Sequence, residues 1–115
     1  MLQVKNKKTG EILAVKVDVA KDIFSRMIGL MFKNSLGESD GLLIAPCNSI
    51  HTFFMKFNLD IIFMNSESQV VKVIEDIPPW RITRMYWSAR KVLELKGGTL
   101  KGSLSKGDYL EVKSV

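Results

Sequence analysis

Residues 59–74 have the sequence LDIIFMNSESQVVKVI, in which two apolar, β-branched runs flank the polar segment NSES. Val, Ile and Phe are enriched in strands, and a short cluster of Asn and Ser between two such runs is typical of a hairpin turn. The second run is followed by Pro78 and Pro79, which cannot donate to a strand ladder. This stretch therefore predicts a central antiparallel hairpin with strands at 59–64 and 69–74.

Shorter strands are predicted on both sides of this hairpin. Within 12–19, three valines alternate with polar residues, which is the period of a half-buried strand. A turn cluster at 6–10 separates this strand from a β-rich run at 2–5, so an N-terminal hairpin is predicted as well. Further short strands are predicted at 42–45, 52–55, 92–95 and 109–112, which gives about eight strands in all.

The apolar period changes near residue 20 from that of a strand to that of a helix. The residues at helical spacing are Ile23, Met27, Leu30 and Met31. Because this spacing places them on one helix face, one main helix is predicted at about residues 20–32. A short helical turn is predicted at 99–104, whereas 80–91 has no clean period and is interpreted as a loop.

These elements predict an α+β, β-rich fold. The order of strands lacks the regular βαβ alternation that produces a parallel sheet. A compact, mainly antiparallel sheet or a partly closed small barrel, with the main helix across one face or end, leaves the fewest open strand edges. The 115 residues suffice for one core, so a single domain spanning residues 1–115 is expected.

Composition narrows the possible functions. The net charge of +5 permits nucleic-acid binding, but the lysines are spread along the chain and no recognised reader motif accompanies them, which disfavours it. The single cysteine, Cys47, excludes a disulfide within the chain and a multi-thiolate zinc site. No apolar run approaches the roughly 18 residues of a membrane helix. We therefore expect a cytoplasmic protein without a membrane segment, cofactor or metal.

Several short motifs together resemble one protein family. They are RMIGLMF at 26–32, GLLI at 41–44, FMK at 54–56 with LDIIF at 59–63, VLEL at 92–95, GG at 97–98 and KGD at 106–108. This set is similar to the uncharacterised bacterial and archaeal family called domain of unknown function 192. The resemblance implies a small single-domain, β-rich fold, and it brings no established activity, cofactor or catalytic residue.

Cys47 and His51 are the only thiol and the only imidazole in the chain, four residues apart. A neighbouring imidazole lowers the pKa of a thiol and makes it a nucleophile. In an extended segment the two side chains would lie about 13 Å apart, but in a helical turn their Cβ atoms would lie roughly 6 Å apart. The alternatives are a cysteine that fills space in the core, a structural or surface histidine, and a two-ligand metal site completed by Asp60 or by another chain.

Asp60 lies among apolar residues of a predicted strand, where an ionised carboxylate needs a partner. Lys56, Arg26 or backbone amides are the candidate partners. Alternatively, Asp60, Lys56 and His51 line one polar pocket, in which shifted pKa values would mark a functional site. Glu94, inside another apolar strand, poses the same question.

The loop at 80–91 interleaves aromatic and cationic residues, among them Trp80, Arg81, Arg84 and Trp87. Exposed Trp and Arg are enriched in binding hot spots. The preferred hypothesis is a non-enzymatic binding or accessory module that presents this loop and Lys56 to a protein or a small anionic ligand. Alternatively, the loop has no binding role: the tryptophan side chains pack beneath the sheet and the arginine side chains extend into solvent.

A second hypothesis is a small thiol-dependent or hydrolytic enzyme. In it Cys47 is the nucleophile, His51 the base, and Asp60 or Lys56 a supporting group. Whether the protein is an enzyme, and its oligomeric state, stay open at the level of sequence.

Overall fold

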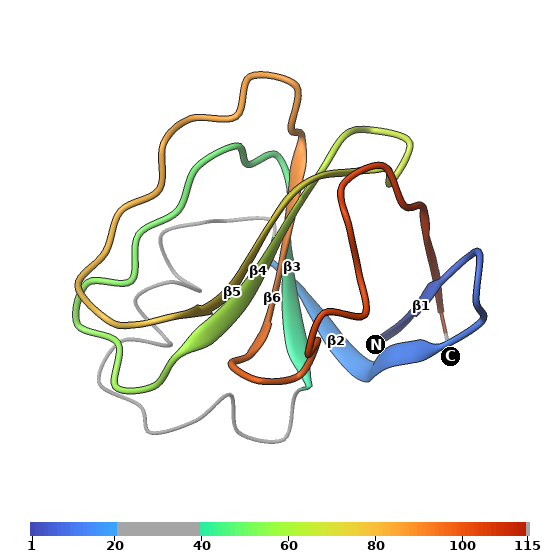
Figure 1. Cartoon of the computed structure of the whole chain (residues 1–115), viewed down its shortest axis with the longest axis horizontal. Coiled ribbons are helices and arrows are strands. Elements are labelled where there is room, and N and C mark those ends of the chain that lie inside the picture. The colour runs from blue at the N-terminus through green and yellow to red at the C-terminus, as the bar shows by residue number, and fades with distance from the viewer. Residues whose placement is uncertain (21–39, 115) are drawn as a thin grey trace.

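The computed structural model describes residues 1–20 and 40–114, which form seven strands (Figure 1). The strands are β1 (Leu2–Asn6), β2 (Ile12–Ala20), β3 (Gly41–Ile44), β4 (Leu59–Met64), β5 (Val70–Ile77), β6 (Lys91–Lys96) and β7 (Leu110–Ser114). They belong to one sheet with the order β5-β4-β6-β3-β2-β1-β7. The pairs are antiparallel except for β2 and β3, which run parallel.

The sheet curls until the beginnings of its two outermost strands meet. Gln69 and Tyr109 form an antiparallel bridge just before β5 and β7. The Leu110 N–H donates to the Ser68 carbonyl oxygen at 2.9 Å, and the Val70 N–H donates to the Asp108 carbonyl oxygen at 2.7 Å. The sheet is therefore a partly closed barrel whose edge strands are joined at one corner.

The central strands are buried on both faces. Along β4, Leu59, Ile61 and Phe63 belong to one apolar cluster, and Ile62 and Met64 belong to a second one on the opposite face. This division follows from the two-residue period of a strand. The side chains described for β3, β4 and most of β6 are accordingly inaccessible to solvent.

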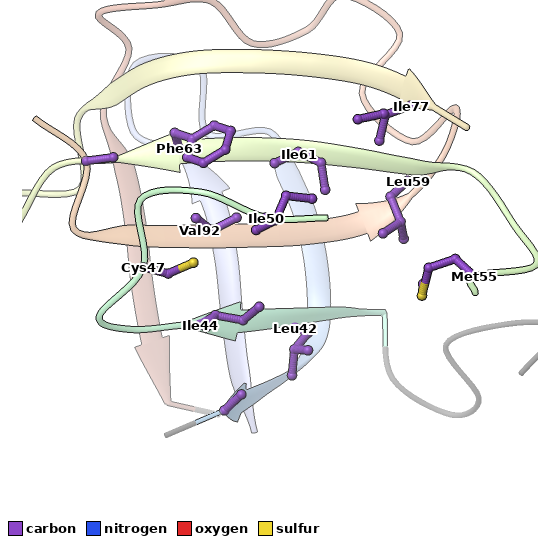
Figure 2. Packing of buried hydrophobic residues seen from close by; sticks show 12 residues of the cluster. Leu42, Ile44, Cys47, Ile50, Met55, Leu59, Ile61, Phe63, Ile77 and Val92 are labelled. Atoms are coloured by element: carbon purple, nitrogen blue, oxygen red, sulfur yellow. The ribbon is translucent and has the colours of Figure 1, made fainter. Parts of the chain in front are cut away.

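The segment between β3 and β4 covers the first cluster. Figure 2 shows its residues Cys47, Ile50 and Met55 beside side chains of β3, β4 and β6. The segment between β5 and β6 runs along the same side of the molecule (Figure 1) and contributes Tyr86 and Ala89 to the same cluster. Two irregular segments thus form an outer layer on this face of the sheet.

The prediction of an α+β fold is wrong. The residues that the structure describes contain strands, turns and irregular segments but no helix. Of the helix predicted at 20–32, Ala20 is the last residue of β2 and pairs with Ile44, and residues 21–32 lie outside the described part. Residues 99–104 form turns where a helical turn was expected. The described fold is an all-β, curled seven-stranded sheet.

The strand predicted at 52–55 is also wrong, because this segment turns. Phe54 has a φ of 64°, in the left-handed region, and the Met55 N–H donates to the Thr52 carbonyl oxygen at 3.2 Å. A residue with this φ breaks the extended backbone that a strand requires. The other predicted strands coincide with observed ones to within about three residues at their ends.

Candidate functional site

Two irregular segments, 46–58 and 78–90, are joined by backbone hydrogen bonds and are called here the paired loops. The Thr52 N–H donates to Arg81 O at 2.8 Å, and the Thr83 N–H donates to Ile50 O at 2.9 Å. Farther along, Tyr86 donates to Asn48 and Cys47 donates to Arg90, at 3.0 and 2.9 Å. Backbone hydrogen bonds therefore link the two loops as they would link two strands, although few of the loop residues have strand conformation.

Thr52 fixes the crossing of the paired loops. Its side chain is fully buried, and its hydroxyl donates to the Pro78 carbonyl oxygen at 2.8 Å. The same hydroxyl accepts the Arg81 N–H at 2.9 Å, while the Thr52 carbonyl oxygen accepts the Trp80 N–H at 3.0 Å. Buried hydrogen bonds of this kind stabilise by about 1 kcal/mol each, so the positions of residues 80 and 81 are well determined.

Large apolar side chains project from the paired loops into solvent. Trp87 is 74% exposed, Ile82 70% and Trp80 56%. The set, called here the aromatic surface, consists of Phe53, Phe54, Trp80, Ile82, Met85 and Trp87. Exposed apolar groups that gather into one patch mark interaction sites more often than isolated ones do.

Ring contacts connect part of the aromatic surface. Phe54 and Trp80 meet edge to face with ring centroids 4.7 Å apart, and Phe53 lies 6.0 Å from Trp80. The His51 ring lies 5.1 Å from Phe53. Such pairs contribute about 0.5 to 1.5 kcal/mol each, so they favour the observed positions of these rings.

Two residues of the aromatic surface have an unfavourable backbone conformation. Phe54 and Trp80 have φ values of 64° and 67°, which bulky residues seldom adopt. Such a residue costs about 1 to 3 kcal/mol, and the surrounding structure must compensate. The Thr52 hydrogen bonds around Trp80 supply part of that compensation, and the strain supports a functional reason for having aromatic residues here.

The paired loops also carry exposed cationic side chains. Lys56, Arg81, Arg84 and Arg90 are exposed, and neither of the paired loops contains an Asp or Glu. The Arg84 guanidinium lies 5.6 Å from the centroid of the Tyr86 ring, within the range of a cation–π contact. The surface therefore combines apolar area with cationic groups and attracts ligands of negative charge.

The structure does not join Cys47 to His51. The buried Cys47 thiol donates to the Ser49 carbonyl oxygen at 3.1 Å, and His51 Nδ1 accepts the Phe53 N–H at 3.3 Å. Within the described residues no hydrogen bond links the thiol to the imidazole. Burial raises the pKa of Cys47, the Ser49 bond lowers it, and the Glu94 charge raises it further. The net rise keeps the thiol protonated, which is the opposite of what a nucleophile needs.

Asp60 is bound by backbone amides. Its fully buried carboxylate accepts N–H groups of Asp76 and Leu100 at 2.8 Å each and of Gly98 at 3.2 Å. These donors come from β5 and from the turn after β6. Of the partners considered from sequence, the amides are the ones observed, and they make Asp60 an anchor between elements.

Glu94 is a second buried carboxylate of the sheet, and its surroundings differ from those of Asp60. Its side chain on β6 is inaccessible to solvent, and neither carboxylate oxygen has a hydrogen-bond partner in the described structure. Its strand neighbours are Leu42 on β3 and Ile61 on β4. Burial raises the pKa of Glu94 to about 7. The carboxyl group is therefore half protonated near neutral pH.

Among the residues described, no group of three or more His, Cys, Asp or Glu side chains is placed to hold a metal ion. The same part of the chain also has no helix whose length and apolar content would let it cross a bilayer.

Four exposed groups were not predicted from the sequence, namely Phe53, Phe54, Ile82 and Met85. Phe53 and Phe54 were read as part of a strand, although two adjacent Phe residues on a strand point to opposite faces. One of the two would have had to be exposed on a sheet with one solvated face. This conflict was the sign in the sequence that at least one of the two Phe side chains is exposed.

Comparisons with known proteins match this chain to one protein family. Residues 4–112 match the family of domain of unknown function 192, described as Uncharacterized ACR. The chain is 36% identical over 102 residues to a UPF0127 protein of Pyrococcus abyssi, covering 84% of this chain and 85% of that protein. The names of the family and of this relative give no activity.

Two crystal structures have a similar fold. A protein of unknown function from Novosphingobium aromaticivorans superposes with a TM-score of 0.77 at 21% identity, covering 96% of this chain and 82% of that one. A protein from Sinorhizobium meliloti, provisionally named a transcription regulator, gives 0.76 at 24% identity, covering 96% and 91%. At these identities the likeness shows the fold alone. The match over residues 4–112 and the curated relative establish that the chain belongs to the domain of unknown function 192 family.

Proposed function

We propose that the protein is a non-enzymatic binding module that presents the aromatic surface, with the cationic groups around it, to a protein or a small anionic ligand. The observation that carries this proposal is the exposure of Trp80 and Trp87 on loops that hydrogen bonds hold in place. Ordered aromatic anchors lose little conformational entropy on binding, so most of their contact energy is available for affinity.

The positions of the arginines support the same proposal. Arg81 and Arg84 stand beside the exposed apolar groups, and Trp with Arg is the composition of binding hot spots. The protonated thiol of Cys47 and the engagement of His51 with Phe53 argue against the alternative of a thiol enzyme. We place the module in the cytoplasm, where a free cysteine stays reduced.

The proposal is tested with Trp80→Ala and Arg84→Ala, because neither side chain belongs to the buried clusters. Both variants should fold like the wild type by circular dichroism and thermal melting. The matched controls are Tyr109→Ala and Lys16→Ala, an exposed aromatic and an exposed cation outside the paired loops.

The immobilised protein is incubated with cell lysate, and the proteins retained by each variant are compared by mass spectrometry. A partner retained by the wild type and both controls should fall at least about tenfold with Trp80→Ala, since hot-spot truncations cost about 2 kcal/mol or more. Retention at the wild-type level by both binding variants would show that the aromatic surface is not the site.

A further inference from the structure

The backbone of residues 80–84 has one occupied edge and one open edge. His51 and Ile82 form an antiparallel bridge, flanked by the bonds from Thr52 N–H to Arg81 O and from Thr83 N–H to Ile50 O. In this pattern the bridged residues are a non-hydrogen-bonded pair, whose own N–H and C=O groups point away from each other. The Ile82 backbone groups therefore point away from the loop at 46–58.

The alternation continues along the segment. Arg81 and Thr83 direct their backbone groups inward, where the Arg81 N–H donates to Thr52 and the Thr83 carbonyl oxygen accepts the Ser49 hydroxyl at 3.2 Å. For Ile82 and Arg84, no hydrogen bond within the described structure reaches the N–H or the C=O. Both residues are exposed. These four backbone groups are called here the open edge.

An open edge bordered by apolar side chains is a template for another strand, because an added strand satisfies both the donors and the acceptors. A lipid bilayer would do the reverse. Inserting Ile82 and Trp87 into hydrocarbon would leave the backbone groups of the open edge without partners, at several kcal/mol each. The geometry favours an extended polypeptide as the ligand.

The charge of the surface specifies the kind of polypeptide. The paired loops contain Lys56, Arg81, Arg84 and Arg90 and no acidic residue, so carboxylates are attracted and cationic peptides are repelled. Side chains of a strand alternate between two faces, so a matching segment alternates apolar residues with Asp or Glu. The apolar residues would contact Trp80 and Ile82.

We infer that the module binds an extended acidic peptide segment, which adds as a strand to the open edge at Ile82 and Arg84. This inference rests on the proposed function and names the class of partner for the same surface. It assigns a role to the backbone, which side-chain substitutions alone would not detect.

The probe is a capped seven-residue peptide of alternating Glu and Val. It is compared with a version N-methylated at the Val amides and with a version that has Lys in place of Glu. Binding is followed by tryptophan fluorescence, and amide hydrogen exchange is measured by NMR. The first peptide should slow exchange of the Ile82 and Arg84 amides at least about tenfold, as strand pairing does. The Arg81 and Thr83 amides are already bonded and serve as internal controls.

Charge reversal provides a second measurement. Arg81 lies on the strand face opposite to Ile82, where the Glu side chains of the peptide project. Arg81→Glu should therefore weaken binding of the Glu peptide about tenfold and improve binding of the Lys peptide, whereas Lys16→Glu should do neither. Equal binding of the N-methylated and unmethylated peptides would overturn strand addition. The inference would equally be overturned if the Glu peptide failed to bind at millimolar concentration, including the case in which anionic vesicles bind in its place.

The two proposals fail in different ways. If N-methylation has no effect while Trp80→Ala still loses its captured partner, the strand addition is wrong and the binding module stands. If capture is unchanged in Trp80→Ala and Arg84→Ala, the binding module itself is wrong.

Discussion

At the scale of single residues, Glu94 links the fold to pH. Its carboxyl group is buried without a hydrogen-bond partner in the described structure, and its pKa rises from 4.5 to about 7 on folding. Between these two values the folded state keeps a proton that the unfolded chain releases. The free energy of unfolding is therefore highest below about pH 4.5, falls as the pH rises to about 7, and changes no further through this group.

The expected loss through Glu94 is about 3 kcal/mol, since each pKa unit corresponds to about 1.4 kcal/mol. Glu94→Gln should remove this part of the pH dependence and be more stable than the wild type at pH 8. Denaturant titrations at pH 4.5, 6 and 8 measure it, with the exposed Glu67→Gln as the matched control. If the free energy of unfolding depended on pH in the same way for Glu94→Gln and the wild type, the role given to Glu94 would be contradicted.

Cys47 gives a second prediction at this scale. Because burial raises the pKa of its thiol, alkylation of the native protein should be slower than that of a free thiol, with a midpoint above the usual value of about 8.5. His51→Ala should leave the rate unchanged, since His51 bonds to Phe53. The rate of iodoacetamide labelling from pH 5 to 10 tests both statements. A depressed midpoint that His51→Ala abolishes would revive the enzyme hypothesis.

At the scale of elements, Thr52 determines how firmly the paired loops are held. Thr52→Val keeps the shape of the side chain but removes its hydroxyl, so the Pro78 carbonyl oxygen and the Arg81 N–H lose their partner. We expect a loss of about 2 kcal/mol in stability and faster exchange of the Trp80 and Arg81 amides. Thr99→Val, which removes an exposed hydroxyl bonded to Lys96, is the control. Unchanged exchange at residues 80 and 81 would contradict this role.

The same element shows why part of the fold escaped prediction. The β4–β5 hairpin was predicted correctly, because both strands are rich in β-branched residues and the turn between them is formed by residues that are neighbours in sequence. Residues 52–55 have the composition of a strand, but the Thr52 hydroxyl finds acceptors 26 and 29 residues away. Contacts at such separation leave no periodic signal, so the turn at Phe54 could not be read from neighbouring residues.

For the candidate site, too, part could be predicted from the sequence and part could not. Trp80, Arg81, Arg84 and Trp87 were selected for their composition, and the structure places them at the surface as the hypothesis requires. Asp60 was selected because a carboxylate among apolar residues is costly, which is true of an anchor and of a catalytic group alike. The difference depends on the amides of Gly98 and Leu100, whose approach only the folded chain reveals.

At the scale of the whole molecule, both apolar clusters share the strands β3, β4 and β6. Removing either cluster therefore exposes the other, so the sheet should unfold in one step. Phe63→Ala and Leu93→Ala, one in each cluster, should each lower the free energy of unfolding by about 3 to 5 kcal/mol.

The test follows unfolding by two signals that report on different parts. Tryptophan fluorescence reports on the paired loops, and far-ultraviolet circular dichroism reports on the sheet. The two transitions should coincide in the wild type and in both variants. A fluorescence transition at lower denaturant than the dichroism transition would show that the paired loops unfold separately.

The positive φ angles of Phe54 and Trp80 have a consequence for protein engineering. Glycine adopts this conformation without strain, so a search for thermostable variants would favour glycine at both positions by about 1 kcal/mol each. Such a variant would have no backbone strain at these two positions and would lack the ring contact between Phe54 and Trp80. Selection for heat resistance and selection for the module's task would therefore drive these two positions in opposite directions, as happens where activity depends on a strained site.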